Sequence, residues 1–250
     1  MPDDRELISG VHQGMAKVQR SAVYIDALNL YNGALKGTSH RWLDIRALAQ
    51  EIVGPDELTS VVYVTGELNP DDSPDPDSPK RQAIYTRAIA ARGGVSITRN
   101  RFVVGTNPRV VSRNDSWHER TYPPLPAHLA TELDAIDAAL KEERRIRVRL
   151  PEEKMTDVGL AVAMVNDFHL GHCDRTVLVA NDSDYKPALD VLASLGQRPL
   201  VVSPQQTVNK HLKSGAWDSR RLDRAVLLRC ELPDSFRAMG TTFTRPVEWR

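Results

Sequence analysis

Two aspartates follow a predicted strand in the stretch VLVANDSDYKP, residues 177 to 187. Asp182 and Asp184 stand one residue apart in a turn, and an apolar helical pattern begins near Pro187. Ser183 or Asp184 is suited to cap that helix, and Pro187 fits its first turn. Capping leaves Asp182 unexplained, because two like charges this close repel each other unless a cation lies between them. The pair therefore indicates either a helix cap or a metal site.

Two other segments carry acidic residues in comparable places. Asp26 ends the apolar run AVYI and is followed by Asn29, while Asp157 lies in the first turn of a predicted helix. Each has a simpler interpretation, since Asp and Asn cap helices and an acid near a helix N-terminus is favoured by the helix dipole. Taken together, carboxylates of this kind suit Mg²⁺ or Mn²⁺. An ion held in this way activates water and stabilises a phosphate under attack.

Strands and helices alternate along most of the chain. Apolar runs predict strands at 21–26, 58–66, 95–105, 146–150, 175–180 and 198–203. Helical spacing predicts helices at 41–53, 81–94, 155–171 and 185–196, and a short helix together with the segment 217–228 closes the domain. This alternation predicts a mainly parallel sheet with helices on both faces. Such sheets bind ligands at the carboxyl ends of their strands, where Asp26 and the Asp182–Asp184 pair would meet.

One predicted helix, residues 155–171, carries an apolar stripe. Its members are Val158, Ala161, Val162, Val165 and Phe168. The sequence also predicts three parts peripheral to the main domain: an N-terminal lead-in at 1–20, an insertion at about 106–150 and a C-terminal tail at 229–250. The main domain is expected to cover residues 21–228.

The composition is that of an ordinary globular protein. The 250 residues carry 33 basic and 33 acidic side chains, so nucleic-acid binding would depend on local basic clusters. Neither cysteine has a partner at metal-ligand spacing, which favours reduced thiols. We expect a cytoplasmic protein that does not associate with membranes, because no signal peptide or membrane-spanning run is visible.

The motifs YIDALNLY, KMTDVGLAVAMV and TVLVANDSDYKPALDVLASLGQRPLVV resemble, in that order, the acidic motifs of the NYN domain family. The likeness is to its bacterial LabA-like group and covers most of residues 21–228. The strand, NDSDY and following helix are its most specific part. The resemblance implies an α/β, PIN-like three-layer sandwich with a central, mainly parallel sheet. It also implies hydrolysis of RNA phosphodiester bonds at an acidic Mg²⁺ or Mn²⁺ site, leaving a 5′-phosphate and a 3′-hydroxyl.

The resemblance also implies roles for particular residues. Asp26, Asp157, Asp182 and Asp184 are the expected catalytic and metal-binding acids. Residues expected to contact the substrate are Asn29, Ser183 and Lys154. Two positions depart from the pattern: Ala27 stands where many relatives have glycine, and Ala163 where many have another aspartate.

RNA needs cations beside such an acidic pocket. Arg145, Arg147 and Arg149 alternate, so a strand would place all three on one face, suited to a phosphate backbone. A solvated edge strand explains them equally well. The leading hypothesis is a metal-dependent ribonuclease, with RNA as partner and with homo-oligomerisation left open. The alternative is a non-catalytic RNA-binding or regulatory protein on the same fold, which Ala163 favours, and a phosphatase using the same acids is a third hypothesis.

Overall fold

The computed structural model describes residues 18–70, 75–110, 145–153 and 155–250, and for residues 101–110 and 145–153 it describes the backbone alone. The chain divides into two compact units. The first comprises Met1–Asn100 and Met155–Arg250, and the second comprises Arg101–Lys154. The first unit contains all four acidic residues of the predicted site.

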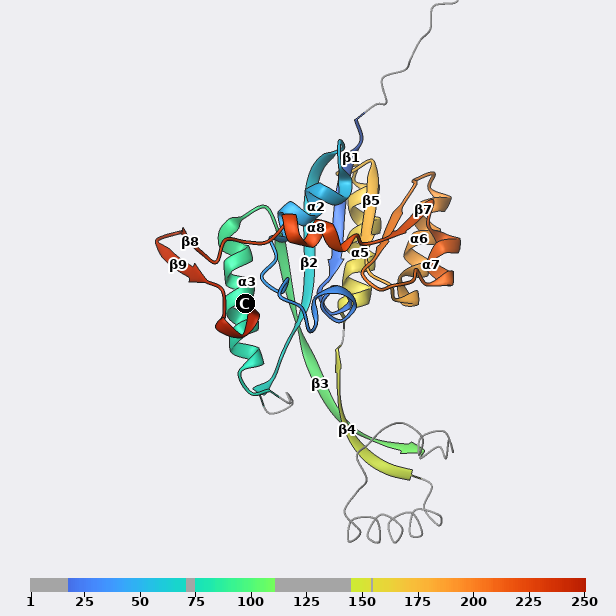
Figure 1. Ribbon diagram of the computed structural model, residues 1–250. Helices are drawn as coiled ribbons and strands as arrows, with labels where there is room; N and C mark the ends of the chain where they lie inside the picture. The colour runs from blue at the N-terminus through green and yellow to red at the C-terminus, as the bar shows by residue number, and fades with distance from the viewer. Residues whose placement is uncertain (1–17, 71–74, 111–144, 154) are drawn as a thin grey trace, which may run out of the picture. The chain divides into compact units, whose positions relative to one another are not determined.

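A mainly parallel sheet forms the centre of the first unit (Figure 1). Its strands, in spatial order, are β3 (Ser96–Val110), β2 (Glu57–Glu67), β1 (Arg20–Asp26), β5 (Arg175–Val179), β6 (Leu200–Ser203) and β7 (Asp218–Arg221). Parallel pairing joins β1 to both β2 and β5, β5 to β6, and β6 to β7. The predicted α/β class and mainly parallel sheet are confirmed.

In the second unit, the later part of β3 pairs with β4 (Arg145–Glu153). The two strands are antiparallel, with Phe102 opposite Glu153 and Val110 opposite Arg145. The strand predicted at 146–150 is therefore present and extends beyond both predicted ends. Residues 111–144 of the predicted insertion lie outside the described residues.

Helices follow most strands of the first unit. They are α1 (Ala27–Leu30) with the π-helical turn Tyr31–Leu35, α2 (Ile45–Val53), α3 (Ser78–Arg92), α5 (Thr156–His169), α6 (Lys186–Ser194), α7 (Lys210–Gly215) and α8 (Arg224–Arg229). The α2 helix begins later than predicted because Asp44 caps it, accepting a hydrogen bond from the Ala47 amide at 3.0 Å.

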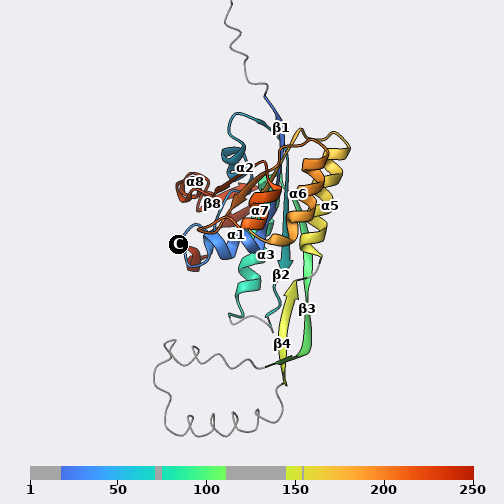
Figure 2. The ribbon, with the colours of Figure 1, turned by 90° about the vertical axis from the view of Figure 1, so that its right-hand side faces the viewer.

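Alternating side chains along the strands separate two buried clusters. Val23 and Ile25 of β1 pack into a cluster that includes residues of α2, α3 and α8. Tyr24, between them, packs with residues of α5, α6 and α7 on the opposite face. Figure 2 shows the helices on both sides of the sheet. The three-layer arrangement implied by the resemblance is thus present.

The α5 helix buries a different face from its predicted stripe. Leu160 and Met164 are fully buried, whereas Val158 is 69% and Val162 61% exposed. Residues 158–165 are apolar or glycine almost all round the helix, so periodicity alone did not identify which side meets the core. Of the predicted stripe, Val158 and Val162 are exposed, whereas Ala161, Val165 and Phe168 are partly buried and pack against the second buried cluster.

The segment expected to be a C-terminal tail has structure of its own. It contains the antiparallel pair β8 (Ser235–Ala238) and β9 (Thr241–Thr244) and ends in a 3₁₀ turn, Val247–Trp249. Trp249 is only 8% exposed and packs against Trp42 and Tyr85, at ring-centroid distances of 6.4 and 5.7 Å. The chain therefore returns to the first buried cluster at its C-terminus.

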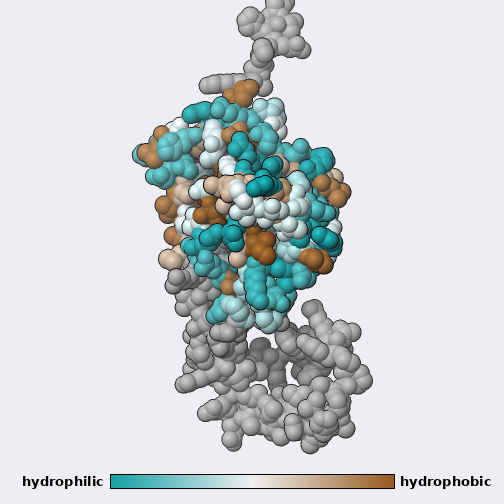
Figure 3. Space-filling view, turned by 90° about the vertical axis from the view of Figure 1, so that its left-hand side faces the viewer, coloured by the Kyte–Doolittle hydropathy of each residue, from teal (hydrophilic) through white to brown (hydrophobic). Residues whose placement is uncertain are grey.

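The surface over α3 and the β8–β9 pair is mostly hydrophilic. Figure 3 shows brown apolar residues there as small separate groups among teal ones. Among the described residues, no helix is both long and apolar enough to span a bilayer.

Candidate active site

Asp26 is held at the carboxyl end of β1 by its own turn. It is 2% exposed and caps α1, with its Oδ1 accepting from the Asn29 amide at 2.9 Å. The Asn29 side-chain Nδ2 donates to the other oxygen, Oδ2, also at 2.9 Å. The capping interpretation of Asp26 is therefore correct, and it also orients a carboxylate at the sheet edge where ligands bind.

Asp182 begins the turn after β5. Its Oδ1 accepts from the Asp184 amide at 3.1 Å and caps the 3₁₀ turn Ser183–Tyr185, which leads into α6. The expectation that Ser183 or Asp184 supplies the cap was wrong. The extra 3₁₀ turn begins before α6 and so moves the capping position upstream. Asp184 remains exposed at the surface.

Tyr185 connects two of the acidic segments. Its fully buried hydroxyl lies 3.1 Å from Asp26 Oδ2 and 3.0 Å from Asp157 Oδ1. Burial and the two neighbouring carboxylates raise the pKa of Tyr185 well above its usual value, so it stays a neutral phenol. One hydroxyl proton thus bridges two acids. Sequence reasoning missed this role, although Tyr185 lies in the NDSDY motif.

Asp157 shows that the acids lie within electrostatic reach of one another. It is half-buried in the first turn of α5, directly after Met155 turns the chain at a left-handed φ of 72°. Burial raises the pKa of Asp157, and the negative charges of Asp26, Asp182 and Asp184 raise it further, while the hydrogen bond from Tyr185 acts in the opposite direction. The sheet edge therefore brings together acids from three separate segments.

A chain of amides ties the same strand ends together. The Oδ1 of Asn29 accepts from the Asn181 backbone at 3.1 Å, and the Oδ1 of Asn181 accepts from the Asn209 backbone at 2.8 Å. The Nδ2 of Asn181 donates to Gln205 Oε1 at 2.7 Å. Asn29 and Ser183 also line a polar cavity of about 290 Å³ beside Asp182. Sequence reasoning identified Asn29 and missed the other three amides.

The donors present suit a hydrated hard cation. All four acids offer oxygen, the ligand that Mg²⁺ and Mn²⁺ prefer. Within the described parts of the chain, no three His, Cys, Asp or Glu side chains are already grouped at metal-binding geometry. Mg²⁺ nevertheless usually keeps several waters and needs only one or two carboxylates. Asp157, Asp182 and Asp184 fit that requirement, whereas the oxygens of Asp26 already accept three hydrogen bonds.

An apolar groove of about 620 Å³ opens beside two of the acids. It runs between α5 and α6, with Asp157 and Asp184 at one end and exposed Val158, Val162 and Val191 along its walls. The stripe predicted on α5 therefore lines a groove.

The basic residues expected to contact RNA are less fully described. Lys154 lies outside the described residues. Arg145, Arg147 and Arg149 lie on β4, opposite Val110, Pro108 and Thr106, as backbone positions. Their contact with RNA stays a prediction.

The NYN domain family model matches residues 107–219, a stretch that contains Asp157, Asp182 and Asp184 but begins after Asp26. A curated protein, the 6-hydroxy-3-succinoylpyridine 3-monooxygenase HspA of Pseudomonas putida (strain DSM 28022 / S16), is 28% identical over 254 residues, covering 92% of this chain and 75% of its own length. The crystal structure of a protein of unknown function, VPA0982 from Vibrio parahaemolyticus RIMD 2210633, aligns at 12% identity with a TM-score of 0.38, covering 83% of this chain and 96% of that one.

Proposed function

Because residues 107–219 match the NYN domain family, whose members are generally nucleases, we propose that this chain is a metal-dependent ribonuclease of that family. The observation that carries the proposal is the gathering of acids from three segments, in which the Tyr185 hydroxyl contacts both Asp26 and Asp157. Burial, followed by the charges of Asp26, Asp182 and Asp184, raises the pKa of Asp157. Perturbed carboxyl groups of this kind are typical of functional sites. Nucleases of this family typically use divalent metals and act on RNA. The carboxylate oxygens of Asp157, Asp182 and Asp184 are ligands that such metals prefer.

The proposed mechanism assigns separate tasks to the residues. Asp157, Asp182 and Asp184 would hold Mg²⁺ or Mn²⁺, which when bound lowers the pKa of water and neutralises phosphate charge. Asn29 and Tyr185 fix Asp26, and Tyr185 also orients Asp157. Water attacks the phosphorus, and Asp157 Oδ2, the oxygen of that carboxyl to which Tyr185 does not donate, accepts the released proton. The bond from phosphorus to the 3′-oxygen breaks, and the 3′-oxygen takes up a proton from solvent water, so the products carry a 5′-phosphate and a 3′-hydroxyl.

Asp182→Asn provides the direct test. The amide keeps an oxygen that can cap the 3₁₀ turn, but it removes one negative charge from the ion's ligands. We expect cleavage of labelled RNA in Mn²⁺ to fall at least about 100-fold, in the range seen when an electrostatic contributor to a transition state is lost. EDTA should abolish cleavage by the wild type. Asp218→Asn, at the amino end of β7, is the matched control and should cut normally.

Equal cleavage by the wild type and Asp182→Asn would assign the activity to other residues or to a contaminant. RNA binding in EDTA, without cleavage in any metal, would instead support a non-catalytic RNA-binding protein. Ala163 favours that alternative, since it packs against the second buried cluster where relatives often carry an acid.

A second candidate function is oxygenation of a substituted pyridine, the activity in the name of the Pseudomonas putida relative. The likeness extends over 92% of this chain, and the apolar groove beside Asp157 and Asp184 suits a planar ring. A monooxygenase consumes O₂ and a reductant, whereas hydrolysis of RNA requires neither. Oxygen uptake with 6-hydroxy-3-succinoylpyridine and NADH therefore separates the two functions.

A further inference from the structure

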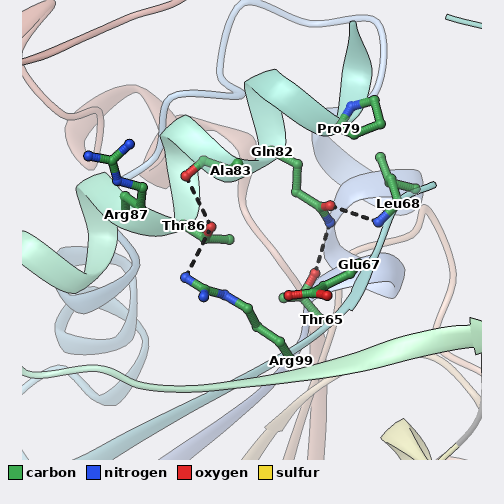
Figure 4. A pocket seen from close by; sticks show the side chains of 9 residues that line it. All are labelled: Thr65, Glu67, Leu68, Pro79, Gln82, Ala83, Thr86, Arg87 and Arg99. Carbon is green, nitrogen blue, oxygen red and sulfur yellow. Dashed lines mark hydrogen bonds between the residues drawn. The ribbon is translucent and has the colours of Figure 1, made fainter. Parts of the chain in front are cut away.

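A cavity of about 210 Å³ lies at the carboxyl end of β2, between that strand, α3 and the start of β3 (Figure 4). At about 30 Å³ per water molecule, this space equals about seven waters. It has room for one sugar with its phosphate. Its lining includes two cations, Arg87 and Arg99, and one carboxylate, Glu67.

Gln82 fixes the shape of this cavity. Its Oε1 accepts from the Leu68 amide at 3.0 Å, and its Nε2 donates to the Gly66 carbonyl at 2.7 Å and to Thr65 Oγ1 at 3.3 Å. These bonds, two of which Figure 4 shows side by side, attach the end of β2 to α3. Gln82 is therefore a positioning residue whose hydrogen-bonding groups are already used.

The charged side chains of the cavity keep their donors and acceptors available. Arg99 donates one hydrogen bond to Thr86 Oγ1, at 3.5 Å, and makes no other in the described part of the chain. A guanidinium has five N–H donors in a flat fork that matches a phosphate. Arg87, at the α3 side of the cavity, and Glu67, on β2, are both exposed.

Two contacts place the cavity along the same sheet edge as the acids. Thr65 directly follows Val64, which is the register partner of Asp26 in the neighbouring strand. On β3, Asn100 Nδ2 donates to Thr156 Oγ1 at 3.0 Å, and Thr156 precedes Asp157. Adjacent strands lie about 4.8 Å apart. The cavity therefore lies one strand away from Asp26 along this edge of the sheet.

We propose that this cavity binds one ribose-phosphate unit of the substrate, and that Glu67 distinguishes ribose from deoxyribose. The proposal rests on the proposed function, which brings RNA to this edge. Arg99 and Arg87 bind the phosphate, and Glu67 accepts a hydrogen bond from the ribose 2′-hydroxyl. A carboxylate alone would repel nucleic acid, but beside two cations it gains a donor that DNA lacks. An acidic residue plays the same part toward ribose in dinucleotide-binding folds.

The test compares binding of a single-stranded RNA with that of the DNA of identical sequence, by fluorescence anisotropy in EDTA so that nothing is cut. The wild type should bind RNA about tenfold more tightly, the value of one hydrogen bond to a charged group. Glu67→Ala should weaken the binding of RNA but not of DNA. The ratio of the two affinities should then fall close to one. Arg99→Gln should weaken both about equally and lower the salt dependence by about one ion, because it removes a phosphate contact.

Glu57→Ala, at the amino end of β2, and Arg237→Gln, on β8, are matched controls that should bind like the wild type. The proposal is overturned if Glu67→Ala tightens both nucleic acids equally, since Glu67 would then only repel them, or if the wild type binds RNA and DNA alike. Cleavage in Mn²⁺ is measured separately. Discrimination by Glu67 without cleavage would therefore support this inference while contradicting the proposed nuclease activity.

Discussion

At the scale of single residues, the site combines structural and chemical roles in the same side chains. Asp26 and Asp182 each cap a turn, and Tyr185 donates toward two carboxylates. These bonds hold the acids close together although like charges repel. The repulsion acts on Asp157, whose pKa is raised by burial and by the neighbouring negative charges.

Asp157→Asn should stabilise the metal-free protein at neutral pH. The folded-state pKa of Asp157 lies above the usual 3.8, so the folded state binds its proton more tightly than the unfolded chain does. Ionisation therefore costs stability, and this cost is absent below pH 3.8 and grows as pH rises through the folded-state pKa. Solvent screens the half-exposed group, so we expect a gain below about 1 kcal/mol, or up to about 4 °C in Tm.

Thermal unfolding in EDTA at pH 7 and near pH 3 checks this expectation, and the difference should vanish at the lower pH. In saturating Mn²⁺ the wild type should have the higher Tm, because the ion binds and stabilises the wild type more than Asp157→Asn. The control Asp218→Asn should have the Tm of the wild type in each of these conditions. If Asp157→Asn is less stable than the wild type at pH 7 in EDTA, burial and the neighbouring charges do not destabilise the ionised Asp157 carboxylate.

At the scale of elements, the loops at the sheet edge are packed closely enough to limit which residues fit. A Cβ on Gly33, in the turn after α1, would lie 3.0 Å from the backbone carbon and the Cβ of Pro204, and 3.1 Å from Cγ of Gln205. Gln205 is the residue that accepts from Asn181. The turn after β1 and the loop after β6 are therefore in direct contact. This contact positions the amide side chains of Asn29, Asn181 and Gln205 beside Asp26.

Gly33→Ala should separate these two loops. We expect a loss of about 1–3 kcal/mol in the free energy of unfolding, the usual cost of overpacking. Gly159→Ala on α5 is the contrasting variant, because its Cβ would meet nothing within 4 Å and alanine favours helix by about 1 kcal/mol over glycine. Urea unfolding compares the two. If both variants shift stability in the same direction, the close packing at Gly33 is not limiting.

At the scale of the whole molecule, the chain's last residues complete the core that its early residues begin. Trp249 packs against Trp42 and Tyr85, and Arg41 lies over the Trp249 ring at 5.7 Å. The face of the sheet that carries α2 and α3 therefore depends on a segment more than 150 residues away in sequence.

Trp249→Ala should lower the free energy of unfolding by about 3–5 kcal/mol, the usual cost of removing a buried aromatic side chain. For a chain of this size, that loss lowers Tm by about 6–20 °C. Val247→Ala is the control, since Val247 is 72% exposed and should change stability by less than about 0.5 kcal/mol. Calorimetry measures both. Equal Tm values for the two variants would mean that the C-terminal segment contributes nothing to the core.

Local patterns in the sequence predicted most of the fold. Apolar runs identified the strands at 21–26, 58–66 and 175–180, because a strand buried on both faces is apolar throughout. The helices predicted at 81–94, 155–171 and 185–196 were correct to within a few residues, and α2 begins later than predicted because Asp44 caps it. In the closing segment 217–228, residues 218–221 form the strand β7, which was not predicted, and the helix α8 begins only at Arg224. The alternation of strands and helices then predicted the parallel sheet and the edge at which Asp26 and Asp182 lie.

What the sequence determined by itself was the set of acids and the sheet edge that gathers them, because strand ends and turn residues are local features. The tertiary structure decided which partners those acids have. Tyr185, Asn181 and Gln205 act through contacts between segments far apart in sequence, and no periodicity encodes such contacts. The buried side of α5 and the return of Trp249 to the core were decided in the same way. An apolar residue favours burial, but only packing against a particular neighbour determines where that burial takes place.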